Sequence, residues 1–185
     1  DLGGGFAING GATVVSDYRF RGISQTDERF AVQGTLSLSH SSGFYATVWG
    51  SSIDDYVAGG SDQEIDLVAG WRRTYGNTTV DVGVLYYYYP GSSSIVPGYN
   101  SDFVEPYASL AHVFGPVTAK VTAAYAPSQA ALSIGAGSED NFYLAGDVSA
   151  ALGSGFTASA HLGHSFGPSY LTIGVEYTDW NVGLA

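Results

Sequence analysis

The chain of 185 residues carries six Lys or Arg residues against seventeen Asp or Glu residues, a formal charge of −11 at pH 7. Only 12% of its residues are charged and 45% are hydrophobic, which argues against a disordered chain. The negative charge disfavours nucleic acid as a partner, because that binding depends on Lys and Arg neutralising phosphates. The absence of cysteine excludes disulfides, cysteine-based zinc sites and thiol nucleophiles.

The length fits one domain, 1–185. The chain contains no methionine and begins at Asp1 without a basic and apolar leader, so we expect a product from which a signal peptide has been removed. Its longest apolar run, 82–89, is far shorter than the ~18 residues that a membrane helix needs. The two remaining classes are a soluble β protein and a transmembrane β-barrel.

Alternation of apolar and polar residues predicts β-strands along the whole chain. In the segment 64–74, for example, Ile65 and Leu67 alternate with Glu64 and Asp66. Each such segment is about as long as a tilted membrane strand, ~9–11 residues. The ten predicted strands are 6–16, 31–40, 43–52, 64–74, 78–89, 103–114, 117–126, 141–151, 156–164 and 172–185.

The connections between these strands alternate between long and short. The long ones are 17–30, 53–63, 90–102 and 127–140, and the tight turns between them are 41–43, 75–77, 115–116 and 153–155. Outer-membrane barrels have short turns at one end and long loops at the other, whereas a Greek-key sandwich does not keep this alternation. We therefore predict an all-β fold, an up-and-down antiparallel transmembrane β-barrel of about 10–12 strands.

The same alternation assigns the two faces of the barrel, with the apolar face toward lipid and the polar face toward the lumen. A lumen rich in carboxylates attracts cations, which favours a narrow cation-preferring pore. The alternative is a filled interior in which the charges pair with one another, since small barrels pack their lumen with side chains. The predicted lumen-lining residues are Glu64, Asp66, Arg72, Asp81, Glu105, Lys120, Asp147 and Glu176.

Aromatic residues stand near the ends of the predicted strands, most densely in the tyrosine run 86–89. Tyrosine and tryptophan suit the headgroup layer of a membrane, so we interpret them as an aromatic girdle. A platform for stacking sugars is the alternative. The predicted girdle residues are Trp49, Trp71, Tyr86, Tyr88 and Trp180.

Arg19 and Arg21 are two of only six cationic residues and lie in the first long connection. They could form an interior latch by pairing with lumen carboxylates, or pair with lipopolysaccharide phosphates at the rim, since arginine suits both. The scarcity of other cations favours the latch.

Catalysis finds little support, and we expect no enzyme, cofactor or metal. The chain has neither a Gly-x-Ser-x-Gly elbow nor a His-Glu-x-x-His motif. Asp147 and His161 point the same way on neighbouring predicted strands, with Ser149 and Ser159 nearby, but cross-strand proximity is common in sheets. The loop carboxylates in 54–62 miss the spacing of a calcium-binding EF-hand.

Residues 16–24, Ser-Asp-Tyr-Arg-Phe-Arg-Gly-Ile-Ser, resemble the opening signature of the bacterial TorF-type porin family. Later blocks occur in a similar order: 40–45, 48–51, 64–67, 81–84 with the tyrosine run, and 177–183. The resemblance implies an outer-membrane β-barrel of Gram-negative bacteria with its long loops outside, and no catalytic residues. Members of that family continue by about one further hairpin, so we expect the chain to lack one C-terminal hairpin.

These observations predict an outer-membrane, porin-like channel for passive passage of small, cationic or neutral solutes. Its expected partners are outer-membrane lipid, lipopolysaccharide and the solutes. One alternative is a non-conducting outer-membrane barrel that acts through its long loops in adhesion or envelope structure. Another is a soluble, carbohydrate-binding β protein.

Overall fold

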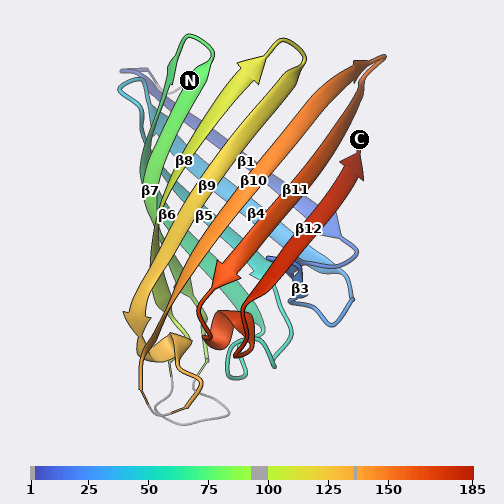
Figure 1. Ribbon diagram of the computed structural model, residues 1–185. Coiled ribbons are helices and arrows are strands. Elements are labelled where there is room, and N and C mark those ends of the chain that lie inside the picture. Colours follow the sequence, from blue (N-terminus) through green and yellow to red (C-terminus); the bar gives the residue numbers. More distant parts are fainter. Residues whose placement is uncertain (1–2, 93–99, 136) are drawn as a thin grey trace.

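The computed structural model describes residues 3–92, 100–135 and 137–185, which form one ten-stranded antiparallel sheet (Figure 1). Every strand of the sheet pairs with the strands that precede and follow it in the order β1-β4-β5-β6-β7-β8-β9-β10-β11-β12. The strands are β1 (Phe6–Val15), β4 (Ala31–His40), β5 (Phe44–Ser52), β6 (Gln63–Tyr75), β7 (Thr78–Tyr88), β8 (Phe103–Phe114), β9 (Val117–Gln129), β10 (Glu139–Gly153), β11 (Phe156–Phe166) and β12 (Tyr177–Leu184).

The prediction of an all-β, up-and-down antiparallel fold is confirmed, and no α-helix occurs in the described ranges. Most strand ends lie within three residues of the predicted ones, and two larger differences occur. A short hairpin, β2 (Arg19–Phe20) with β3 (Ile23–Ser24), forms inside the first long connection. The last strand begins at Tyr177 rather than 172, because the 3₁₀ turn η2 (Tyr170–Thr172) ends in the left-handed residue Ile173, which cannot continue a strand.

All the tight turns lie at one end of the sheet and all the long connections lie at the other (Figure 1). Gly76 and Gly115 occupy tight turns with φ of 59° and 61°, a backbone conformation that residues other than glycine rarely adopt. We call the end of the sheet with the tight turns the turn end and the end with the long connections the loop end. A second 3₁₀ turn, η1 (Ala130–Leu132), also lies at the loop end.

The sheet curves strongly, so that β10, β11 and β12 lie in front of β1, β4 and β5 in Figure 1. Within the described residues, however, β1 pairs only with β4, and β12 pairs only with β11. Closure of the sheet through a β1–β12 ladder, which the predicted barrel implies, is therefore absent from this part of the chain.

The strand register separates the side chains into two faces, because directly paired residues share a face. We call inner the face that contains Tyr87, Tyr143 and Asp179, which are buried, and outer the opposite face. One transverse row of the inner face runs Tyr45, Gly70, Gly83, Tyr107, Ala124, Tyr143, Ser165 and Tyr177 from β5 to β12.

Glycine lies beside tyrosine on the inner face for a steric reason. A Cβ atom at Gly70 would lie 2.6 Å from the Tyr45 hydroxyl oxygen, and one at Gly83 would lie 2.7 Å from the Tyr107 hydroxyl oxygen. The tyrosine rings therefore lie over glycine backbone, and this arrangement fills the interior without forcing the strands apart.

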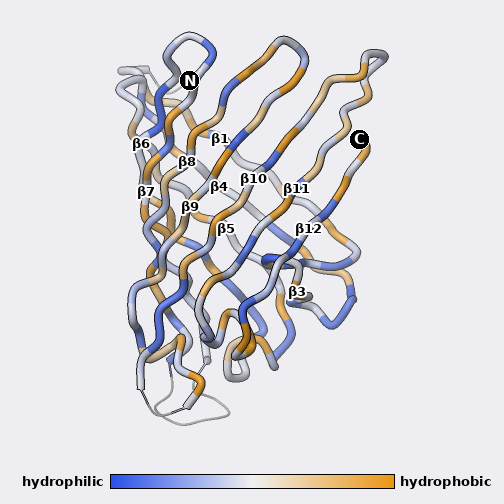
Figure 2. Tube along the Cα trace, in the orientation of Figure 1, coloured by the Kyte–Doolittle hydropathy of each residue, from blue (hydrophilic) through white to orange (hydrophobic). Residues whose placement is uncertain are grey.

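The outer face exposes large apolar side chains along the strands. Figure 2 shows hydrophobic and hydrophilic residues alternating along the strands, with hydrophilic residues gathered in the connection that carries β3. The exposed apolar residues of the outer face include Ile8, Val32, Leu36, Leu38, Val48, Leu67, Val82, Val84, Leu110, Val121, Leu144, Val148, Leu162 and Val182. Among the described residues, no helix is both long and apolar enough to cross a membrane.

The largest cluster of buried apolar residues lies toward the loop end. Tyr87 and Phe103 stack with ring centroids 4.1 Å apart, and Phe20 meets Tyr87 edge-on at 5.8 Å. Leu132 of η1 is fully buried in the same cluster. The interior is thus packed with apolar side chains at this end.

Candidate functional site

The inner face of the sheet is the candidate site, because it gathers most of the ionisable residues that the sequence assigned to a lumen. Seven of the eight predicted lumen residues lie on this face by strand register: Glu64, Asp66, Arg72, Asp81, Glu105, Lys120 and Asp147. Glu176 does not, and that prediction is wrong. It lies before β12 with an exposed side chain and accepts a hydrogen bond from the Gly167 amide at 3.1 Å.

Asp179 takes the inward position that the sequence assigned to Glu176. It is 8% exposed, and the Tyr143 hydroxyl donates to its carboxylate at 3.1 and 3.2 Å. The error follows from the predicted start of the strand at 172. The alternation of Tyr177 and Asp179 with Thr178 and Trp180 contains the signal that places Asp179 inside.

Arg21 is a buried cation in the half of the interior that lies toward the loop end. Its Nη2 lies 2.6 Å from Glu105 Oε1, and the two side chains are only 7% and 4% exposed. Its Nη1 donates to Asn141 Oδ1 at 3.2 Å, and its guanidinium carbon lies 4.1 Å from the centre of the Tyr143 ring. Burial by itself would lower the pKa of Arg21, but the Glu105 carboxylate raises it above the ordinary value, so the guanidinium stays charged.

Arg21 reaches the interior because the β2–β3 hairpin turns at Arg21 and Gly22, with φ of 47° and 81°. The Tyr177 hydroxyl donates to the Arg21 carbonyl at 2.9 Å, so the hairpin that follows β1 also contacts β12. Arg21 therefore joins β8, β10 and β12 to the first long connection. These contacts link the segment after β1 to strands that do not pair with β1 in the sheet.

Arg19 behaves differently from Arg21 and forms no interior pair. Its Nε lies 2.6 Å from Asp17 Oδ2, and its Nη2 lies 3.5 Å from Glu28 Oε1, with 49% of the side chain exposed. Asp17 also accepts hydrogen bonds from Ser24 Oγ at 2.6 Å and Thr26 Oγ1 at 3.1 Å. Burial would raise the pKa of Asp17, but these hydroxyl donors and Arg19 together lower it below its usual value.

The turn-end half of the inner face holds a second arginine–carboxylate pair. Arg72 Nε and Nη2 both donate to Asp81 Oδ2, at 2.8 and 2.6 Å. The Tyr45 hydroxyl donates to Asp81 Oδ1 at 2.7 Å and also contacts the Tyr107 hydroxyl. Arg72 is 59% exposed whereas Asp81 is only 11% exposed, so solvent reaches this pair from the arginine side.

His161 lies between two carboxylates on the inner face. Its Nδ1 is 2.7 Å from Asp147 Oδ1, and its Nε2 is 3.1 Å from Asp179 Oδ1 and 3.0 Å from the Tyr143 hydroxyl. Ser149 and Ser159 pair with each other across β10 and β11. Both ring nitrogens of His161 are thus already engaged by groups other than serine.

Two carboxylates near the loop end, Glu64 and Asp66, have no ion-pair partner among the described residues. Glu64 is 1% exposed and accepts a hydrogen bond from the Tyr18 hydroxyl at 3.2 Å. Asp66 Oδ1 is buried without a hydrogen-bond partner. On the inner face, the carboxylates Glu64, Asp66, Asp81, Glu105, Asp147 and Asp179 outnumber the cations Arg21, Arg72 and Lys120.

The predicted girdle residues divide between the two faces. Tyr86, Tyr88 and Trp180 are outer-face residues exposed by 40%, 41% and 71%, and Trp71 shares a row with the outer residues Phe44 and Val82. Trp49 is on the inner face, so its assignment as a lipid-facing residue is wrong. It pairs with Asp66, and its ring centroid lies 5.3 Å from that of Tyr18. A shift of one residue reverses the face, and Val48 takes the outer position in this strand.

No cluster of three or more His, Asp or Glu residues suited to a metal ion occurs in the described part of the chain. None of the curated proteins compared with the chain matches it. A family model does match, over residues 2–185, and its description is "Bacterial protein of unknown function (Gcw_chp)". The chain, with its single curved sheet and its charged inner face, therefore belongs to the bacterial family Gcw_chp.

Proposed function

We propose that this chain is a bacterial outer-membrane protein that inserts through the outer face of its sheet and has an interior that is occluded at the loop end. The observation that carries the proposal is the division of charge between the faces. Ion pairs such as Arg21–Glu105 and Arg72–Asp81 lie on the inner face, while the strand interiors of the outer face expose apolar side chains. An apolar face around a charged interior is the pattern of membrane barrels and the reverse of a soluble sandwich.

Insertion requires that β1 and β12 find partners. Unpaired strand edges are not tolerated in the hydrocarbon layer, since each free amide or carbonyl costs several kcal/mol there. The contacts of the β2–β3 hairpin with β8, β10 and β12 support a rounded, barrel-like shape in which the two edges approach each other.

Occlusion is supported by the packing at the loop end. Tyr87, Phe103 and Leu132 are each at most 3% exposed, and Arg21 and Glu105 fill the space beside them. A water-filled passage through this cluster would require these apolar groups to separate. The structure therefore favours the non-conducting alternative over free diffusion of solutes.

A narrow, cation-preferring passage is the second candidate. It is favoured by the excess of inner-face carboxylates, above all by Glu64 and Asp66, which lack a cationic partner among the described residues. Such an excess of negative charge attracts cations and repels anions.

The test of insertion is a pair of matched substitutions. Val84→Arg places a charge on the outer face of β7, and we expect it to abolish recovery of folded protein in the membrane fraction, because arginine in the bilayer centre costs ~2–4 kcal/mol. Ile173→Arg, at a 75% exposed loop position, is the control and should leave recovery unchanged. Recovery of folded protein in water without detergent would refute insertion.

The test of occlusion is a planar-bilayer recording of the reconstituted protein. We expect no steady conductance in potassium chloride. Cation-selective steps that the substitutions Glu64→Gln and Asp66→Asn reduce would instead establish the second candidate.

A further inference from the structure

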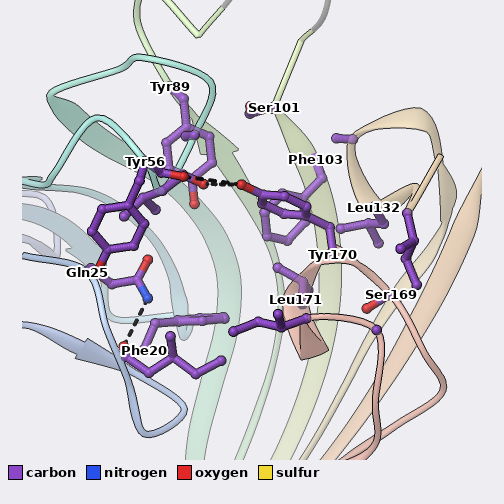
Figure 3. A pocket seen from close by; sticks show the side chains of 17 residues that line it. Phe20, Gln25, Tyr56, Tyr89, Ser101, Phe103, Leu132, Ser169, Tyr170 and Leu171 are labelled. Carbon is purple, nitrogen blue, oxygen red and sulfur yellow. Dashed lines mark hydrogen bonds between the residues drawn. The ribbon is translucent and has the colours of Figure 1, made fainter. Parts of the chain in front are cut away.

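A cavity of about 350 Å³ opens at the loop end, and members of the apolar cluster of the interior line it (Figure 3). All five long connections contribute to its wall, through residues such as Phe20, Tyr56, Ser101, Leu132 and Leu171. The volume falls within the range of small-molecule sites, ~300–1,000 Å³. Residues far apart in the chain thus converge on one pocket, whereas the tight turns contribute nothing to it.

The floor of this pocket is buried and apolar, and its rim is apolar but exposed. Phe103 and Leu132 are 3% and 0% exposed, whereas Ile134 and Ile173 at the rim are 55% and 75% exposed. None of the described lining residues carries a charge. Exposed isoleucines beside a buried apolar floor are an unfavourable arrangement in water unless an apolar molecule covers them.

The walls are tied to one another by hydrogen bonds, so the pocket exists before any ligand enters. The Tyr170 hydroxyl donates to the Val57 carbonyl at 2.9 Å, which joins the last long connection to the second (Figure 3). The Tyr56 hydroxyl donates to the Ser24 carbonyl at 2.7 Å, which joins the second connection to the first. A preformed pocket loses little conformational entropy when it binds.

Two hydroxyls in the wall, those of Ser101 and Ser169, lack a hydrogen-bond partner among the described residues, and the Ser169 side chain belongs to the capping box of η2, which directs it toward the backbone of that turn. Ser101 is 5% exposed, its side chain lines the pocket, and its hydroxyl oxygen is buried without a hydrogen bond. A buried hydroxyl without a partner costs free energy, and a ligand that supplies a hydrogen-bonding group removes that cost.

We propose that the loop-end pocket binds a small, uncharged, mainly apolar molecule that carries one hydrogen-bonding group, with the apolar part on Leu132 and Phe103 and the polar group on Ser101 Oγ. The absence of charged side chains among the described lining residues excludes recognition of a carboxylate, phosphate or ammonium group by ion pairing. Binding at this pocket goes beyond membrane insertion, because the pocket is formed by the connections and not by the outer face.

The experiment is a ¹⁹F NMR titration of the protein reconstituted in lipid nanodiscs with 4-fluorobenzyl alcohol, and empty nanodiscs provide the baseline for partition into lipid. We expect a saturable shift of the fluorine resonance. The same titration with 4-fluorotoluene, which lacks the hydroxyl, should show affinity about tenfold lower, the usual effect of one hydrogen bond.

Two variants locate the site. Leu171→Trp fills the pocket and should abolish saturable binding, while Leu152→Trp, the same change at the turn end, should leave it intact. Ser101→Val should lower the affinity for the alcohol about tenfold and leave that for 4-fluorotoluene unchanged, since this hydroxyl has no partner to lose in the free protein. Circular dichroism of each variant reports whether the fold is retained.

Absence of saturable binding to the wild-type protein overturns the proposal. So does binding that survives Leu171→Trp in a folded sample. Equal affinity for the alcohol and for 4-fluorotoluene would overturn the assignment of Ser101 as the polar anchor. Membrane insertion is measured separately by fractionation, so the two proposals can fail independently.

Discussion

The inner face carries two arginine–carboxylate pairs of similar geometry in opposite surroundings. Arg21 and Glu105, at the loop end, approach to 2.6 Å with 7% and 4% of their side chains exposed. Arg72 and Asp81, toward the turn end, also approach to 2.6 Å, but Arg72 is 59% exposed. The same chemistry thus occurs once in a closed interior and once at a surface that solvent reaches.

The difference shows that the interior is not uniform along its length. The loop-end half is closed by the β2–β3 hairpin and by the apolar cluster around Tyr87 and Phe103. The turn-end half is lined by polar groups and has no comparable cover among the described residues. In the first half both partners of the ion pair are desolvated, whereas in the second half Arg72 remains 59% exposed and only Asp81, at 11%, is buried.

The largest effect that would test this comparison is expected from Arg21→Ala. The substitution leaves Glu105 buried without its cation and should cost about 3–5 kcal/mol of unfolding free energy. Unfolding in detergent, followed by circular dichroism in a urea series, measures the loss. The control Arg19→Ala removes a half-exposed pair and should cost less than about 1 kcal/mol.

A double variant separates lost charge pairing from lost packing. Arg21→Met with Glu105→Leu removes both charges, and we expect it to recover most of the stability lost in Arg21→Ala. If Arg21→Ala has no more effect than Arg19→Ala, the loop-end half is not the closed interior described above.

The next largest effect is expected from Gly163→Val in β11. A side chain at Gly163 would overlap the Tyr143 hydroxyl, which hydrogen-bonds to Asp179, so the ring has to move away from its partners. We expect a loss of about 1–3 kcal/mol, measured by the same urea series. Gly146→Val is the matched control, because a Cβ there meets no atom within 4 Å; an equal loss in both variants would point to backbone effects alone.

A smaller effect is expected from Arg72→Ala. Because Arg72 is 59% exposed and the buried Asp81 keeps its hydrogen bond from Tyr45, the substitution should cost about 1 kcal/mol, and the cost should shrink further in 1 M salt. Unfolding measured at low and high ionic strength checks this. A salt-insensitive loss as large as that of Arg21→Ala would show that both halves of the interior are equally closed.

The smallest effect concerns the pH dependence of the first long connection. The pKa of Asp17 is lowered in the folded state, so its carboxylate stabilises the fold above its ordinary pKa of 3.8, and this contribution is lost as the pH falls through the lower folded value. Asp17→Asn should therefore be less stable than the wild type at pH 7, by less than about 1 kcal/mol. The difference between the two proteins should shrink as the pH falls below 3.8 and through the lowered pKa of Asp17, and a constant difference would contradict this account.

Much of the fold follows from local patterns in the sequence. A side-chain period of two places Leu67 and Asp66 on opposite faces whatever the neighbouring strands are, and glycine in turns such as 75–77 limits where a strand can end. These local rules predicted all ten strands of the sheet and their up-and-down order, which the structure confirms. The rules gave the wrong position for two residues: Trp49 was assigned to the opposite face of its strand, and Glu176 was assigned to a strand that begins one residue later.

The candidate site depends on contacts that local patterns do not contain. The sequence raised the possibility that Arg21 pairs with an interior carboxylate, but its choice of Glu105 depends on how the β2–β3 hairpin folds back. The loop-end pocket was not predicted at all. Its walls come from five connections, and no single connection has a periodic pattern that would reveal an inward side.

The sequence by itself therefore determined the secondary structure, the order of the strands and the division of most residues between an apolar and a polar face. Those features depend on the backbone geometry of each strand and on turns of a few residues, so they are encoded locally. The tertiary structure alone decided that Arg21 is buried and Arg72 exposed, and that the long connections enclose an apolar cavity. Burial is a property of what surrounds a side chain, and here the surroundings come from segments that lie up to 156 residues apart in the chain.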